Sequence, residues 1–197
     1  MTTSYCLPAP RALRRAALLF PLLLSACAQN PEVPKLKSEV VQLNQKLQAL
    51  TDEATALEQQ SQLNRQSESG VYLLPAANNP AALRSAIGEI SVSISHLAPE
   101  ANGAQALLHL RARSGTTLPG FTAVVDWGHL DPTTGQPLLV DMLSQPISVS
   151  DALLPRTEVT LELRFSGQTP EQLGFIRLRD VTPTAQSAPA PDAAPQP

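Results

Sequence analysis

Apolar residues recur with a seven-residue period in the segment that follows residue 35. Their steps alternate between four and three residues, which is the spacing of a coiled-coil seam. The repeat then fades, because the next two seam positions are Ser61 and Asn64. The pattern predicts a helical coiled-coil segment over residues 36–66, after a short polar tether at 27–35. The apolar seam positions are Leu36, Val40, Leu43, Leu47, Leu50, Ala54 and Leu57.

Between residues 69 and 181 the period changes from helical to two. Strict alternation of apolar and polar residues is typical of half-buried strands, and weaker runs bring the count to about seven. Turn signals such as Asn102-Gly103 and Thr134-Gly135 separate them. We therefore predict a mostly β chain, an immunoglobulin-like antiparallel β-sandwich at 69–181 preceded by a long N-terminal helix. The strict runs are 90–95, 159–165 and 176–179, and the weaker ones are 71–74, 106–112, 121–127 and 138–143.

The parts around these strands are predicted to carry little other structure. Helical turns are expected only at 81–86 and 171–173, which disfavours a parallel βαβ fold. Residues 182–197 are rich in Ala and Pro with one charged residue, a composition that cannot bury enough surface to fold. We expect a disordered tail there.

The first 26 residues have the three regions of a secretory signal peptide. A basic stretch with Arg11, Arg14 and Arg15 precedes an apolar run at 16–24, which small residues follow. The run is too short to span a bilayer, which takes roughly 20 apolar residues. We predict that residues 1–26 are cleaved.

The last residues of this segment, Leu24-Ser25-Ala26-Cys27, resemble the lipobox of bacterial lipoproteins. The resemblance implies that the Cys27 thiol receives a diacylglyceryl group, that the preceding bond is cut, and that the new amino terminus is acylated, for example with palmitate. Several acyl chains give a stable membrane anchor. The alternative is an ordinary signal peptide cut near Ala26 or Ala28, which leaves Cys27 unmodified.

The residue after the cysteine bears on location. In the sorting rule of enteric-type bacteria, aspartate at that position retains a lipoprotein in the inner membrane, and here the position is Ala28. This favours the outer membrane, with the protein facing the periplasm. Cleavage would leave 11 basic and 17 acidic residues, a net charge of −6 against −3 for the whole chain. That balance argues against nucleic acid as a general partner.

Candidate chemistry is sparse. The histidines His96, His109 and His129 fall on three predicted elements, without the short spacings of a zinc site. Asp126, His129 and Asp131 form the one constellation that could bind a metal or transfer a proton, and they define the rival hypothesis of a periplasmic hydrolase or metal-dependent enzyme. No nucleophile motif or phosphate loop accompanies them. We predict a non-catalytic binding or structural module without a cofactor or metal.

Arginines offer a candidate binding face. If the strands follow immunoglobulin order, those at 107–113, 160–165 and 175–181 are expected to be neighbours in one sheet. Their outward positions would then gather five arginines, which suit carboxylate and phosphate groups. The alternative is an ordinary solvated sheet face. The five are Arg111, Arg113, Arg164, Arg177 and Arg179, with Glu162 among them.

Self-association through the Leu36–Leu57 helix is the other open question. Its flanking positions pair Glu53 with Glu58 and offer no attractive pair, which argues against a parallel dimer. The stretch "KLKSEVVQLNQKLQALTDEATALE" nevertheless resembles the seam of the major murein lipoprotein, a trimeric coiled coil. The apolar stripe could instead pack on the chain's own domain or on an envelope protein or polymer.

Four stretches together look like the YajI-like family of bacterial envelope lipoproteins. They are "SGVYLLP", "NNPAALRSAIGEISVSI", "LPGFTAVVDWG" and "EQLGFIRLRDV". The similarity extends upstream through the heptads to the lipobox. Since the function of that family is unknown, the resemblance implies a location and an architecture but no catalytic residue.

Overall fold

The computed structural model describes residues 32–113 and 115–184. One long helix precedes eight strands and a short 3₁₀ helix, so the prediction of a mostly β chain with an N-terminal helix is confirmed. The predicted signal peptide, Cys27 and residues 185–197 lie outside the described residues. The elements are α1 (Glu32–Gln66), β1 (Val71–Leu73), η2 (Pro75–Ala77), β2 (Ala81–Ser85), β3 (Gly88–Glu100), β4 (Gly103–Ala112), β5 (Phe121–Gly128), β6 (Leu143–Val149), β7 (Glu158–Ser166) and β8 (Phe175–Pro183).

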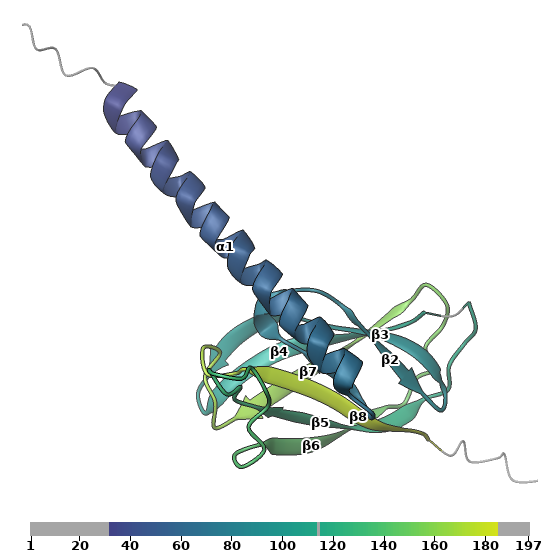
Figure 1. Cartoon of the computed structure of the whole chain (residues 1–197). Coiled ribbons are helices and arrows are strands. Elements are labelled where there is room, and N and C mark those ends of the chain that lie inside the picture. The colour runs from purple at the N-terminus through teal and green to yellow at the C-terminus, as the bar shows by residue number, and fades with distance from the viewer. Residues whose placement is uncertain (1–31, 114, 185–197) are drawn as a thin grey trace, which may run out of the picture. The chain divides into compact units, whose positions relative to one another are not determined.

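The strands form two antiparallel sheets that face each other (Figure 1). One has the order β1-β8-β5-β6, and the other has the order β2-β3-β4-β7. In an immunoglobulin fold strands B and E share one sheet while C and F share the other. The pairs β4-β7 and β5-β8 take these places, and β1 adds an edge strand beyond β8.

Several predicted boundaries are wrong. The helical turn expected at 81–86 is strand β2, whose small side chains hide the alternation of buried Leu83 with exposed neighbours. The strand expected at 138–143 is mostly loop. Strand β6 begins at Leu143 and lies at the edge of its sheet, a position in which a proline such as Pro146 is tolerated. The helix begins at Glu32, within the predicted tether, since proline is tolerated in a first helical turn. Strand β8 extends to Pro183, into the predicted tail.

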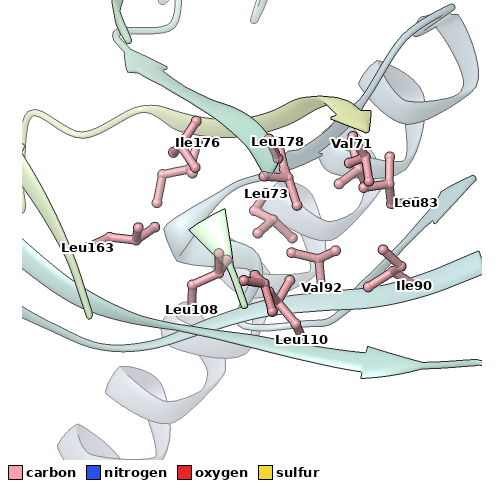
Figure 2. Packing of buried hydrophobic residues seen from close by; sticks show 14 of the residues in the cluster. Val71, Leu73, Leu83, Ile90, Val92, Leu108, Leu110, Leu163, Ile176 and Leu178 are labelled. Atoms are coloured by element: carbon pink, nitrogen blue, oxygen red, sulfur yellow. The ribbon is translucent and has the colours of Figure 1, made fainter. Parts of the chain in front are cut away.

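Apolar side chains from both sheets meet in the space between them (Figure 2). Leu108 and Leu110 of β4 lie among residues of β1, β3, β7 and β8, and both are fully buried. Each such side chain contributes about 1.5 to 3 kcal/mol of stabilisation. Trp127 packs edge-on against Phe165 with ring centroids 5.5 Å apart, as expected for a residue on the inner face of its strand.

The C-terminal part of α1 packs on the sandwich through a second apolar cluster, which includes Ala56, Leu63 and Phe175. Two amide side chains of the helix complete the open edge of β1. Asn64 donates from Nδ2 to the Tyr72 carbonyl (2.9 Å) and accepts from the Tyr72 N–H (2.7 Å). Gln60 accepts from the N–H of Leu74 at 2.7 Å. The helix thus supplies the hydrogen bonds that an edge strand otherwise leaves unpaired.

Candidate functional site

Asp126, the first residue of the predicted constellation, is fully buried on the outward side of β5 and is held by two partners. Its Oδ2 accepts a hydrogen bond from Nε of Arg179 at 2.6 Å, and its Oδ1 accepts one from the Ser144 hydroxyl at 2.6 Å. The bond to Asp126 raises the pKa of the Arg179 guanidinium above its ordinary value, so the arginine stays charged. Arg179 also pairs with Asp180. The Asp126 carboxylate is therefore occupied within the fold.

Asp131 and His129 lie in the loop after β5. Asp131 accepts hydrogen bonds from the N–H groups of Thr133 (2.7 Å) and Thr134 (3.1 Å), which lower the pKa of its carboxyl. This is the geometry of an Asp-stabilised turn. Across the described residues, no hydrogen bond joins any two members of the constellation, and no group of three His, Cys, Asp or Glu side chains could hold a metal ion. The fold assigns Asp126 and Asp131 structural positions.

A different set of residues has the order of a catalytic triad, and the sequence reasoning missed it. The Ser95 hydroxyl lies 2.6 Å from His109 Nε2, and His109 Nδ1 lies 2.8 Å from a carboxylate oxygen of Glu158. These residues come from β3, β4 and β7, three adjacent strands. A base within hydrogen-bond reach of a hydroxyl, itself oriented by an acid, can in principle activate that hydroxyl. Only strand register could have revealed the set.

The surroundings of Ser95 are those of an open sheet face. Its hydroxyl also lies 2.8 Å from His96 Nδ1, and the Glu158 side chain is 43% exposed. The adjacent hollow is about 200 Å³ and is lined in part by His96 and Leu107. Triad enzymes depend on a sheltered site with donors aimed at the reacting oxygen. A cross-strand polar ladder accounts for the same three residues.

The predicted five-arginine face is wrong, because β8 lies in the opposite sheet from β4 and β7. Alternation indicates which side chains face outward, but it does not say which strand lies next to which. Arg164 pairs with Glu162 and Glu100 at 3.0 Å each, and the hydrogen bond to Glu162 is the main cause of its raised pKa. Arg177 donates to the Ser69 carbonyl at 2.7 Å and lies over the Tyr72 ring.

Of the five arginines of the predicted face, Arg111 and Arg113 lie close together in the structure. Arg156, from the loop before β7, lies beside them. The three arginines line a cavity of about 620 Å³, together with Ala112, Gly115 and Pro155. Sequence reasoning missed Arg156 because it lies outside any alternating run. The cavity is therefore the part of the predicted arginine face that persists in the structure, with one new member.

Residues 27–188 match the family described as "Protein of unknown function (DUF3251)". The chain belongs to this family. It is also similar to the uncharacterized lipoprotein YajI of Escherichia coli (strain K12), with 36% identity over 163 residues, which is 83% of this chain and 91% of that protein. The expected resemblance to YajI-like lipoproteins is confirmed.

Two solved structures are similar to this member of the family. The solution NMR structure of E. coli YajI has a TM-score of 0.64 and 32% identity over 73% of this chain and 85% of that one. The structure of Salmonella enterica trimeric lipoprotein SadB has a TM-score of 0.48 and 16% identity, and the match covers 85% of this chain and 86% of that one. The E. coli relative is a lipoprotein, which supports association of this chain with the cell envelope. Within the described ranges, no helix is long and apolar enough to cross a bilayer.

Proposed function

We propose that this protein is a lipid-anchored envelope module that faces the periplasm and works by binding and spacing, without catalysis. The observation that carries the proposal is the contrast along α1, where apolar seam residues are left open while the end of the helix is fastened to a sandwich. Leu36, Leu43 and Leu50 are 57 to 62% exposed. A helix whose C-terminal end packs on its own domain, and whose apolar seam is exposed further toward the N-terminus, is suited to binding other chains through that seam.

The anchor is proposed at Cys27, where the match to the DUF3251 family begins. Mass spectrometry of the mature protein is expected to show a chain that starts at Cys27 and carries acyl groups. Cys27→Ala should leave uncleaved precursor, whereas a soluble mature form starting at Ala28 would overturn the anchor. Ala28→Asp is expected to move the protein from the outer to the inner membrane, as read by fractionation.

The occupant proposed for the seam is a second copy of this chain. Copies anchored through residue 27 would run in the same direction from the membrane, as a parallel coiled coil requires. Burying a leucine in such a seam stabilises the assembly by about 1.5 to 3 kcal/mol. The flanking charges add no attraction and place Glu53 against Glu58, which opposes the pairing, so the apolar seam must supply the association by itself.

In-cell cross-linking of the whole protein tests the seam. Leu43→Asn combined with Leu50→Asn is expected to reduce linked copies at least tenfold. Leu139→Asn is the matched control, because Leu139 is 67% exposed on a loop outside the helix. Unchanged linkage between copies in the double variant would refute self-association through α1, and linkage to one foreign protein instead would identify a different occupant.

The order of Ser95, His109 and Glu158 defines a rival candidate function, hydrolysis of an ester or amide by a serine nucleophile. A fluorophosphonate probe separates the two proposals because it labels only activated serines. We expect no labelling of the wild-type protein. Labelling that Ser95→Ala and His109→Ala both abolish, in folded variants, would establish a hydrolase and overturn the non-catalytic proposal.

A further inference from the structure

We propose that Arg111, Arg113 and Arg156 form a binding site for a ligand that carries a phosphate group. The inference goes beyond the proposed function by assigning a small-molecule site to the sandwich and naming the chemical class of its ligand. It depends on the end of the sandwich where β4 stops and the loop before β7 begins, and it does not depend on the lipid anchor or the helix seam.

Backbone geometry brings the three side chains to one place. Ala112, the last residue of β4, is buried in the core, so Arg111 before it and Arg113 after it are both directed outward. An isolated parallel bridge pairs Ala112 with Pro155, the residue directly before Arg156. Two segments that are far apart in the sequence are therefore joined at the residues beside the arginines.

The loop that carries Arg156 is firmly supported. Leu153 is fully buried and exchanges two backbone hydrogen bonds with Leu118, at 2.9 and 3.0 Å. On the other side, the N–H of Arg113 donates to the Glu89 carbonyl at 3.0 Å. A site whose supporting backbone is held in this way can present its charges without ordering a free loop first.

Little within the described structure neutralises these arginines. Arg111 lies opposite Glu158 in the β4-β7 register, but that carboxylate bonds His109 instead. Among residues 32–113 and 115–184, Arg111 and Arg156 have no side-chain hydrogen bond or ion pair, and Arg113 has only a 3.6 Å contact with Glu89. Both partners of that contact are more than 40% exposed, where ion pairs are weak.

The paired arginines on the same sandwich provide the contrast. Arg164 has two carboxylates within 3.0 Å, and Arg179 has the buried Asp126. In a chain whose net charge is −3, acidic partners are available, yet none of the described residues that line this cavity is acidic. A cluster of cations without internal partners, in a cavity, is where an anion binds with the least competition.

The backbone of Arg156 supports a role for its side chain. Its φ is +65°, a left-handed conformation that is uncommon for residues other than glycine and asparagine. Such outliers cluster at functional sites, where the surrounding structure holds the strained conformation. A glycine would adopt this backbone freely but would supply no charge.

Three guanidinium groups fit phosphate better than carboxylate. A phosphate monoester offers three oxygens and close to two negative charges, whereas a carboxylate offers two oxygens and one charge. The cavity of about 620 Å³ is within the usual range of roughly 300 to 1,000 Å³ for small-molecule sites. It therefore has room for the organic part of a phosphate ester, which could be a soluble metabolite or a lipid head group.

Calorimetric titration of the lipidated full chain in nonionic detergent tests the site, with glycerol 3-phosphate as probe and acetate as the carboxylate control. We expect saturable binding of the phosphate ester, at least tenfold tighter than acetate and weakened by added salt. Arg111→Gln with Arg156→Gln should weaken binding at least tenfold. The matched control Arg164→Gln removes the same kind of charge from the same sheet but leaves the cavity intact, so its dissociation constant should not change.

Arg156→Gly separates loss of charge from loss of fold. It should weaken phosphate binding while the melting temperature stays the same or rises. Absence of saturable phosphate binding by the wild type, or an equal loss in Arg164→Gln, would overturn the site. Neither result bears on the anchor or the seam, which cross-linking and mass spectrometry test separately.

Reconstitution into vesicles identifies the source of the phosphate. Protein in phosphatidylcholine vesicles is titrated with glycerol 3-phosphate and compared with protein in vesicles that also contain phosphatidic acid. Binding that phosphatidic acid blocks supports a lipid head group as the ligand, and equal binding in both supports a soluble ester.

Discussion

The two ends of α1 carry similar side chains and use them differently. Around Leu43 and Leu50 the apolar side chains are more than half exposed. Around Leu63 the helix buries its apolar side chains against η2 and Phe175. The distinguishing residues are the amides Gln60 and Asn64, which match the unpaired backbone groups of β1. An apolar stripe alone permits many partners, whereas hydrogen-bonding groups at fixed spacing select one.

Removing Leu63 tests the docked end of the helix most strongly. Leu63 is 4% exposed, so Leu63→Ala leaves a cavity and should lower the free energy of unfolding by about 2 to 5 kcal/mol. Leu43→Ala, at an open seam position, should change the unfolding of dilute protein by less than about 0.5 kcal/mol. Urea denaturation measures both variants. Equal losses would mean that the two ends of the helix do not differ.

The arginines show a similar contrast between side chains with an acidic partner and side chains without one among the described residues. Arg179→Gln leaves Asp126 buried without its cation and should lower the free energy of unfolding by about 3 kcal/mol. This is the low end of the range for broken buried ion pairs, because the Arg179 side chain is 29% exposed. Arg111→Gln should cost less than about 0.5 kcal/mol. Thermal unfolding checks the pair, and a large loss in Arg111→Gln would reveal a structural partner for that side chain.

Replacing Asn64 tests whether its amide selects the docking surface. Asn64→Leu keeps the approximate shape but leaves the Tyr72 N–H and carbonyl without partners, at a cost of about 1 to 3 kcal/mol. The exposed Asn44 is the control on the other end of α1, where Asn44→Leu should be neutral for unfolding. Hydrogen exchange of the Tyr72 amide should accelerate in Asn64→Leu alone. Unaltered exchange there would show that the edge of β1 does not need the helix.

A gain of stability is expected at the proposed anion site. Arg156→Gly relieves a left-handed backbone and should stabilise the fold by about 1 kcal/mol. Ala112, buried on the neighbouring strand, gives the comparison, because Ala112→Gly removes a core methyl and should destabilise. Differential scanning calorimetry reads both changes, and a lower melting temperature for Arg156→Gly would contradict the assigned strain.

The smallest expected effect is a pH dependence at Asp131. Backbone hydrogen bonds lower the pKa of Asp131 in the folded state. Its contribution to the free energy of unfolding is therefore present above the unfolded pKa and is lost as pH falls through the folded pKa. Asp131→Asn should therefore remove a small part of the decline in stability on acidification below about pH 4. Parallel denaturation of both proteins between pH 7 and pH 3 measures it. If the free energies of unfolding of the two proteins had the same pH dependence over this range, the stabilising role of the turn would be contradicted.

The candidate site was only partly predictable. Arg111 lies in an alternating strand and Arg113 directly follows it, so their outward direction is a local property that periodicity reports. Arg156 follows Pro155 in a loop and reaches the site only through the bridge to Ala112. The Ser95, His109 and Glu158 set was hidden for the same reason, because separations of 14 and 49 residues become contacts only after the strands pair.

The sequence by itself determined the period of each segment, and with it the long helix, most of the strands and the core position of Trp127, because burial of one face imposes a repeat on neighbouring residues. Tertiary structure decided which strands became neighbours, and so it sorted the five predicted arginines between two sheets. It also decided that Asn64 fastens the helix to β1. These outcomes depend on contacts between residues that are far apart in the sequence, and the periodicity of neighbouring residues carries no information about such contacts.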